Sequence, residues 1–86
     1  MNFEFSNHAL NELQKRKISR FLVEEILKNP QQTIPQDDEI TIFQSQIAAE
    51  TEKRYLIRIF VNITVNPPRI VTLYRTSKIA KYWQQS

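Results

Sequence analysis

The chain has 86 residues, of which 41% are hydrophobic and 24% are charged. This length predicts one domain over residues 1–86, with a core that supplies only a modest free energy of folding. The absence of cysteine and the presence of one histidine exclude a disulfide framework, a cysteine-based zinc site and a histidine cluster. The absence of glycine excludes P-loops and Rossmann fingerprints, so we expect no metal and no nucleotide cofactor.

The sequence gives no sign of a membrane partner. No apolar run approaches the roughly 20 residues that a membrane-spanning helix needs. The opening residues also lack the apolar stretch of a signal peptide. We therefore expect a cytoplasmic protein.

Charge is distributed unevenly along the chain. Residues 1–52 contain all nine acids and five of the bases, a net charge of −4, whereas residues 53–86 contain seven bases and no acid, a net charge of +7. A basic half of this kind is typical of a surface that binds a polyanion. The alternative is a solvated face whose excess charge is partly neutralised by acids from the first half.

Two short helices are predicted in the first third of the chain. Ser6 is placed to cap a helix that runs to about Lys17, and Ser19 is placed to cap a second helix that the Asn29-Pro30 step ends. Apolar residues recur at helical spacing in both segments. Because the link between them is very short, we expect an antiparallel helical hairpin with Ile18 closing its end.

Three later segments are rich in β-branched and aromatic residues and are predicted as antiparallel strands. They cover residues 40–47, 53–65 and 69–75, and Asn66-Pro67-Pro68 connects the last two because proline cannot donate to a strand ladder. A short helix is expected at the C-terminal end. The predicted fold is therefore α+β, with an N-terminal helical hairpin packed on an antiparallel sheet of three or four strands.

Alternation along the predicted strand 53–65 assigns its two faces. One face is almost uniformly apolar and should meet the helices; it consists of Tyr55, Ile57, Ile59, Val61, Ile63 and Val65. The other, uncovered face has Arg58 at its middle, together with Tyr74 of the next strand, and Arg75 lies at that strand's end. An arginine in mid-strand must face solvent or bind an anion, and a salt bridge to Glu50 or Glu52 is the alternative.

Basic and aromatic side chains are interleaved on the uncovered face and its rim. Arginine offers a planar fork to phosphate, and aromatic rings offer a stacking surface to unpaired bases, so this combination is typical of contacts with single-stranded RNA. The candidate residues are Lys53, Arg54, Arg58, Phe60, Tyr74, Arg75, Lys78, Lys81, Tyr82 and Trp83. For Tyr82 and for Trp83, the alternative is packing of the terminal helix on the sheet.

Four short motifs indicate a family resemblance. They are FSNHAL at residues 5–10, KRKIS at 15–19, VEEILKNP at 23–30 and IVTLYR at 70–75. With the order of helices and strands, they resemble the RelE/ParE superfamily of small bacterial toxins, in the branch that begins with a His-Ala helix. The resemblance implies a type II toxin, with an acidic antitoxin covering the basic half of the chain.

The resemblance leaves three functions open. In the RelE type it implies ribosome-dependent mRNA cleavage without a metal, in which the RNA 2′-hydroxyl attacks the adjacent phosphate. In the ParE type it implies poisoning of DNA gyrase. The third possibility is a non-catalytic RNA-binding or accessory protein with the same fold, since a fold does not determine a function.

Carried over onto this chain, the RelE pattern assigns catalysis to Arg58, Arg75 and Tyr82. The two guanidiniums would stabilise charge on the phosphate, and Tyr82 would donate a proton to the leaving oxygen. A phenol has an unperturbed pKa of about 10, so it becomes a base only where neighbouring cations favour its ionised form. His8 is the obvious proton-transfer group by chemistry, but its place in the first helical turn favours a structural role.

Overall fold

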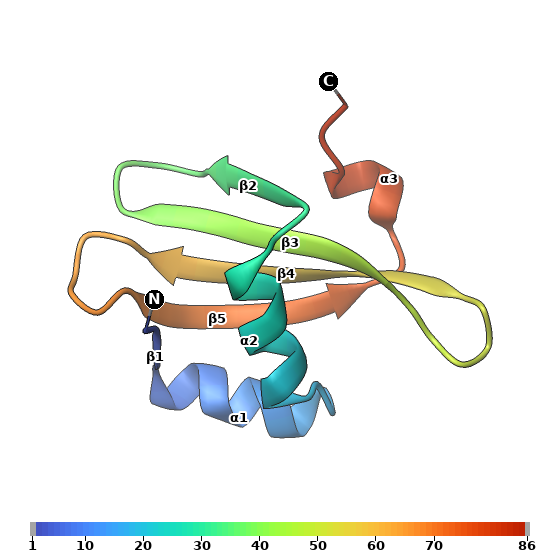
Figure 1. The fold of residues 1–86 in the computed structure, drawn as a ribbon, viewed down its shortest axis with the longest axis horizontal. Coiled ribbons are helices and arrows are strands. Elements are labelled where there is room, and N and C mark those ends of the chain that lie inside the picture. The colour runs from blue at the N-terminus through green and yellow to red at the C-terminus, as the bar shows by residue number, and fades with distance from the viewer. Residues whose placement is uncertain (1, 86) are drawn as a thin grey trace.

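The computed structural model describes residues 2–85, which form one sheet and three short helices (Figure 1). In chain order the elements are β1 (Glu4–Phe5), α1 (Asn7–Lys15), α2 (Arg20–Lys28), β2 (Gln32–Pro35), β3 (Ile40–Ala48), β4 (Arg54–Asn62), β5 (Arg69–Thr76) and α3 (Ile79–Tyr82). The strand order is β1-β5-β4-β3-β2. β1 runs parallel to β5, and the other neighbours are antiparallel. None of the helices in this part of the chain is long and apolar enough to span a bilayer.

Both predicted helix caps are confirmed. The Ser6 hydroxyl accepts a hydrogen bond from the Ala9 N–H at 3.0 Å, and the Ser19 hydroxyl accepts one from the Leu22 N–H at 3.2 Å. Each cap satisfies a backbone donor that has no partner within the helix. The Ser6 hydroxyl also donates to the Val71 carbonyl at 3.1 Å, so the start of α1 is fixed to the middle of β5.

The predicted helical hairpin on an antiparallel sheet of three or four strands is wrong, because the sheet is mixed and has five strands. α1 packs against β5 and α2 packs against β3, so each helix lies on the sheet by itself (Figure 1). Lys17, between them, has a φ of 55°, in the left-handed region, and this residue redirects the chain. The prediction lacked two strands, the two-residue β1 and the edge strand β2.

The face assignment of the central strand β4 is confirmed for its middle residues. The side chains of β4 and β5 that pack under the helices are Ile57, Ile59, Val61, Ile70 and Leu73, all fully buried. β4 ends at Asn62, however, and Ile63 is 50% exposed, so Ile63 is not part of the apolar face to which it was assigned. The other face of the sheet, opposite α1 and α2, is called the open face below.

Replacing Ile59 by alanine should destabilise the domain strongly. The side chain is fully buried between the sheet and the helices, so its truncation leaves a cavity and should cost about 2–5 kcal/mol of unfolding free energy. The matched control is Ile63→Ala, which truncates a half-exposed isoleucine and should cost less than about 0.5 kcal/mol. Urea denaturation of the two variants tests this, and equal midpoints would contradict the assigned core.

Candidate functional site

A row of four polar side chains crosses the open face at the level of Arg58. The strand register places Gln32, Gln44, Arg58 and Tyr74 side by side on β2, β3, β4 and β5. Gln44 Nε2 donates to Gln32 Oε1 at 2.8 Å, and Arg58 Nε donates to Gln44 Oε1 at 2.9 Å. Arg58 Nη1 donates to the Tyr74 hydroxyl at 2.8 Å. These four residues, called the polar row below, form one hydrogen-bonded chain across four strands.

Three aromatic rings surround the Arg58 guanidinium. Its central carbon lies 4.3 Å from the ring centroid of Tyr82, 5.4 Å from that of Phe60 and 5.9 Å from that of Tyr74. Tyr74 stacks on Phe60 with a centroid separation of 5.9 Å and meets Tyr82 edge-on at 6.2 Å. Cation–π contacts of this kind are worth about 0.5–2 kcal/mol each. The rings therefore offset part of the cost of removing the charge from water.

Arg58 is buried, which corrects the expectation that it faces solvent. Its exposed fraction is 8%, and it is not paired with Glu50 or Glu52: the three ion pairs found within residues 2–85 all lie within α1 and its end or within α2. Nη2 has no hydrogen-bond partner among the described residues, and no buried side-chain nitrogen there is left unpaired, so Nη2 reaches solvent. The site is thus an enclosed positive charge with one nitrogen free for an anion.

Tyr82 stands beside this charge with an altered acidity. The pKa of its phenol is lowered from the usual 10, chiefly through the Tyr74 hydroxyl, which can donate to the ionised oxygen. Lys81 lowers the pKa further by hydrogen bonding and by its charge, and the charge of Arg58 adds to this, while partial burial opposes the shift. Tyr82 is therefore a stronger acid than an isolated tyrosine.

The polar row also holds the C-terminal segment on the open face. Gln44 Nε2 donates to the Tyr82 carbonyl at 3.2 Å. Gln32 Nε2 donates to the Gln84 carbonyl at 2.7 Å, and its Oε1 accepts from the Gln84 N–H at 3.2 Å. α3 has no fully buried residue, and Trp83 is half-buried rather than part of the core. Polar contacts are therefore prominent in placing Tyr82 over Arg58.

The structure brings Arg58 and Tyr82 together but separates Arg75 from both. Arg75 pairs with Ile57 in the register, which places it on the face that the helices cover. It is exposed there, and its guanidinium carbon lies 5.4 Å from the centroid of the Tyr55 ring, with Lys53 Nζ 5.8 Å from the same centroid. Two arginines do not converge on one side of the sheet, contrary to the expectation from the sequence.

The other predicted nucleic-acid contacts lie around the site. Arg54 is exposed at the start of β4 and shares the parity of Arg58. Lys78 is exposed immediately before α3, and Lys81 Nζ lies 5.3 Å from the centroid of the Tyr82 ring. Sequence reasoning missed the two glutamines of the polar row, because their significance depends on strand pairing.

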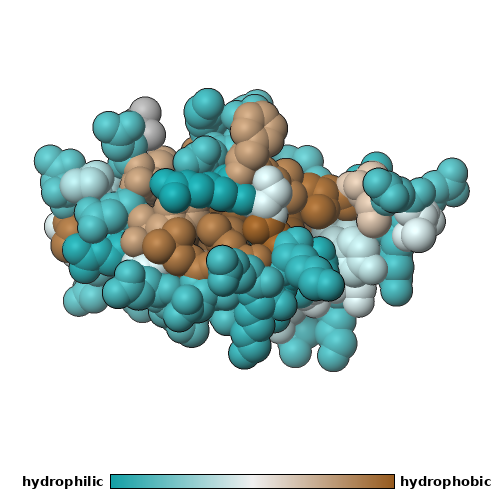
Figure 2. All heavy atoms as spheres, turned by 90° about the horizontal axis from the view of Figure 1, so that it is seen from below, coloured by the Kyte–Doolittle hydropathy of each residue, from teal (hydrophilic) through white to brown (hydrophobic). Residues whose placement is uncertain are grey.

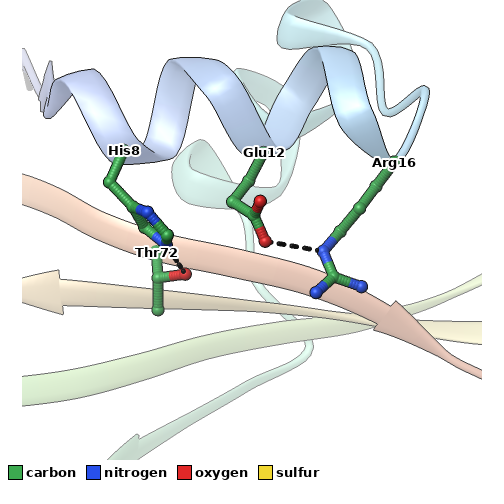
Figure 3. A network of polar contacts seen from close by, with 4 residues as sticks. All are labelled: His8, Glu12, Arg16 and Thr72. Atoms are coloured by element: carbon green, nitrogen blue, oxygen red, sulfur yellow. Dashed lines mark hydrogen bonds and ion pairs between the residues drawn. The ribbon is translucent and has the colours of Figure 1, made fainter.

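His8 belongs to a separate polar network at the α1 side of β5 (Figure 3). Its Nε2 lies 3.2 Å from Thr72 Oγ1, and the ring is exposed in the first turn of α1, which agrees with a structural role. Next along this helix, the buried Glu12 accepts a hydrogen bond from Arg16 Nε at 2.9 Å, and this bond lowers the pKa of the Glu12 carboxyl. No side chain of this network hydrogen-bonds Arg58 or Tyr82 within the described range.

A cavity of about 630 Å³ lies between the N-terminal segment, α2 and β3. Its lining residues are Asn2, Phe3, Phe5, Arg20, Glu24, Leu27, Lys28 and Phe43. Figure 2 views the molecule from the side on which α1 lies in Figure 1 and shows apolar surface at the centre, framed by hydrophilic side chains. Within residues 2–85, no three His, Asp or Glu side chains gather closely enough to hold a metal ion. The cavity contains no counterpart of the Arg58 and Tyr82 pair.

The fold and the site define a small α+β domain with an enclosed arginine on the open face of its sheet. The chain belongs to the family described as domain of unknown function (DUF4258), whose model matches residues 5–75. The matched range contains the polar row but ends before α3, so Tyr82 lies outside it. The comparisons with curated proteins and with solved structures gave no match.

Replacing Tyr74 by phenylalanine should raise the pKa of Tyr82. The substitution removes the hydroxyl that contributes most to the lowered value, so the Tyr82 phenolate forms at higher pH. An ultraviolet titration of tyrosine ionisation measures this, with Tyr82→Phe identifying the Tyr82 transition. Tyr55→Phe, on the helix-covered face, is the control and should leave that transition in place; an unshifted transition in Tyr74→Phe would contradict the contact.

Proposed function

We propose that the protein is a RelE-type toxin that cleaves mRNA on the ribosome, with the Arg58 site as its catalytic centre and no metal. The observation that supports this most is the buried Arg58 guanidinium, which has no carboxylate partner within residues 2–85 and keeps Nη2 free beside the Tyr82 ring. A guanidinium next to an acidified phenol is suited to a phosphate that gains charge during a reaction.

Electrostatics favours an anion at this position. Removing an ion from water costs several kcal/mol even after the protein relaxes. The hydrogen bonds of Arg58 to two neutral acceptors and its cation–π contacts offset this cost without cancelling the charge. A phosphate oxygen that accepts from Nη2 would add a charge-assisted hydrogen bond, which is roughly twice as strong as a neutral one. The charge would therefore stabilise a phosphate in the transition state.

The proposed reaction is a transesterification within the RNA. The 2′-oxygen forms a bond to the adjacent phosphorus and releases its proton to solvent, while the bond from phosphorus to the 5′-oxygen breaks. Tyr82 gives its proton to the departing 5′-oxygen, and the products are a 2′,3′-cyclic phosphate and a 5′-hydroxyl. The lowered pKa makes Tyr82 a better acid for this step. Activity should therefore fall as pH rises through the Tyr82 pKa, below the usual value of 10.

The exposed bases supply attraction rather than chemistry in this proposal. Lys53, Arg54, Arg75, Lys78 and Lys81 are exposed, and their charges attract the ribosome and the mRNA. The same surface is proposed to bind an acidic antitoxin segment in the cytoplasm, because the sequence has no acid after residue 52.

A second candidate is RNA binding without cleavage. It is favoured by the position of Arg75, since the register leaves one guanidinium rather than two at the site. A single arginine and a ring of aromatic side chains can hold a phosphate and stack an unpaired base without catalysing a reaction.

Replacing Tyr82 by phenylalanine should lower mRNA cleavage by about 10²–10⁴-fold while ribosome binding is kept, because the ring remains but the proton donor is lost. Arg58→Lys keeps the charge but loses the planar guanidinium with its paired donors, so it should lower cleavage by about 10²-fold or more. Primer extension on mRNA from cells expressing each variant measures cleavage, and ribosome co-sedimentation measures binding. Arg69→Gln removes an exposed arginine at the far end of β5 and serves as the control.

The outcomes separate the candidates. If the wild-type protein produces new mRNA ends within reading frames, and Tyr82→Phe does not produce them, the endoribonuclease is supported. Ribosome binding without cleavage ends supports the binding candidate. DNA breaks in cells whose mRNA shows no new ends would support the hypothesis of a gyrase-inhibiting toxin. If expression of the protein does not slow the growth of cells that contain no antitoxin, both toxin hypotheses are refuted and an accessory protein is favoured.

A further inference from the structure

Gln44 lies at the centre of the polar row, between Gln32 and Arg58. Its exposed fraction is 0%, and its amide makes three hydrogen bonds: Oε1 accepts from Arg58 Nε, and Nε2 donates to Gln32 Oε1 and to the Tyr82 carbonyl. The orientation of the amide is determined, because an arginine can only donate and a carbonyl can only accept. One neutral group thus contacts both members of the proposed catalytic pair.

From this geometry we propose that Gln44 is a positioning residue that fixes Arg58 and Tyr82 relative to each other and leaves the charge of Arg58 uncompensated. The proposal rests on the proposed function for its catalytic meaning. Gln44 and Tyr74 occupy Nε and Nη1 of the guanidinium, which directs Nη2 to solvent. The bond from Gln44 to the Tyr82 carbonyl holds the phenol over the same guanidinium, at 4.3 Å.

An amide is the side chain that this position requires. A carboxylate of the same shape would pair with Arg58 and cancel the charge that attracts a phosphate, and it could not donate to the Tyr82 carbonyl. An aliphatic side chain would leave Arg58 Nε and the Tyr82 carbonyl without partners in a buried place. Glutamine alone among these provides an acceptor and two donors without a charge.

The test uses Gln44→Glu as the main variant, because it preserves shape, and Gln44→Leu as the second. Gln46→Glu is the matched control, since Gln46 lies two residues along β3 on the same face, pairs with Leu56 and is half-buried. Two readouts are independent of RNA: the ionisation of Tyr82 in a tyrosine titration, and the NMR signal of the Arg58 Nε–H, assigned as the one missing from Arg58→Lys. The third readout is the kcat of mRNA cleavage.

Gln44→Glu should raise the pKa of Tyr82, because the new carboxylate opposes the positive field and the Tyr82 carbonyl loses its donor. It should also shift the Arg58 Nε–H signal and lower kcat by about 10²-fold, an effect typical of misplaced catalytic groups. In Gln44→Leu the Arg58 Nε–H loses its acceptor, so it should exchange with solvent faster than in the unmodified protein. In Gln46→Glu all three readouts should stay close to those of the unmodified protein.

The failure of this proposal and that of the proposed function can be told apart. If Gln44→Glu folds and leaves the Tyr82 titration and the Arg58 Nε–H signal as they are in Gln46→Glu, Gln44 positions neither group and the proposal is overturned. If both signals change as expected while the unmodified protein cleaves no RNA, the positioning role is supported and the endoribonuclease proposal fails.

Discussion

A positive charge buried in the central strand is the constraint to which the open face is adapted. A buried guanidinium carries a full positive charge, so its neighbours must accommodate that charge. None of the ion pairs within residues 2–85 involves it, and the charge is accommodated by an amide oxygen, a phenol oxygen and three aromatic rings. These groups come from β3, β4, β5 and α3, so the charge ties the end of the chain to the middle of the sheet.

The same constraint gives the edge strand β2 a role beyond extending the sheet. Gln32 accepts from Gln44 and thereby fills one of the two donor positions of a fully buried amide. It also exchanges two hydrogen bonds with Gln84, which keeps the segment after α3 beside the sheet. A sheet of three strands would leave Gln44 short of a partner, and unpaired buried donors cost about 1–3 kcal/mol. The edge strand β2 and the site are therefore linked.

Features that depend on local sequence were predicted well, and features that depend on pairing were not. Serine caps and the alternation of β4 are visible in a few consecutive residues, whereas β1 is too short to show alternation and β2 ends in proline. The alternation of side chains along β4 correctly placed Arg58 on the open face. It did not predict the burial of Arg58, because the C-terminal segment that covers this residue is distant in sequence. Arg75 shares the parity of Leu73, which is fully buried under the helices, so alternation along β5 accounts for the face on which Arg75 lies.

The positive charges of the chain are of two kinds, exposed ones such as that of Arg75 and the enclosed one of Arg58. The exposed bases, including Arg75 and Lys53 around Tyr55, act through water, and salt screens them over a Debye length of about 8 Å at physiological ionic strength. The charge of Arg58 is enclosed by protein and is screened much less. Attraction of a polyanion should therefore weaken steeply with salt, while the stabilisation of a phosphate already seated at Arg58 should change little. In the proposed function, the exposed bases of residues 53–86 would attract the RNA, and the single enclosed charge of Arg58 would act on the phosphate.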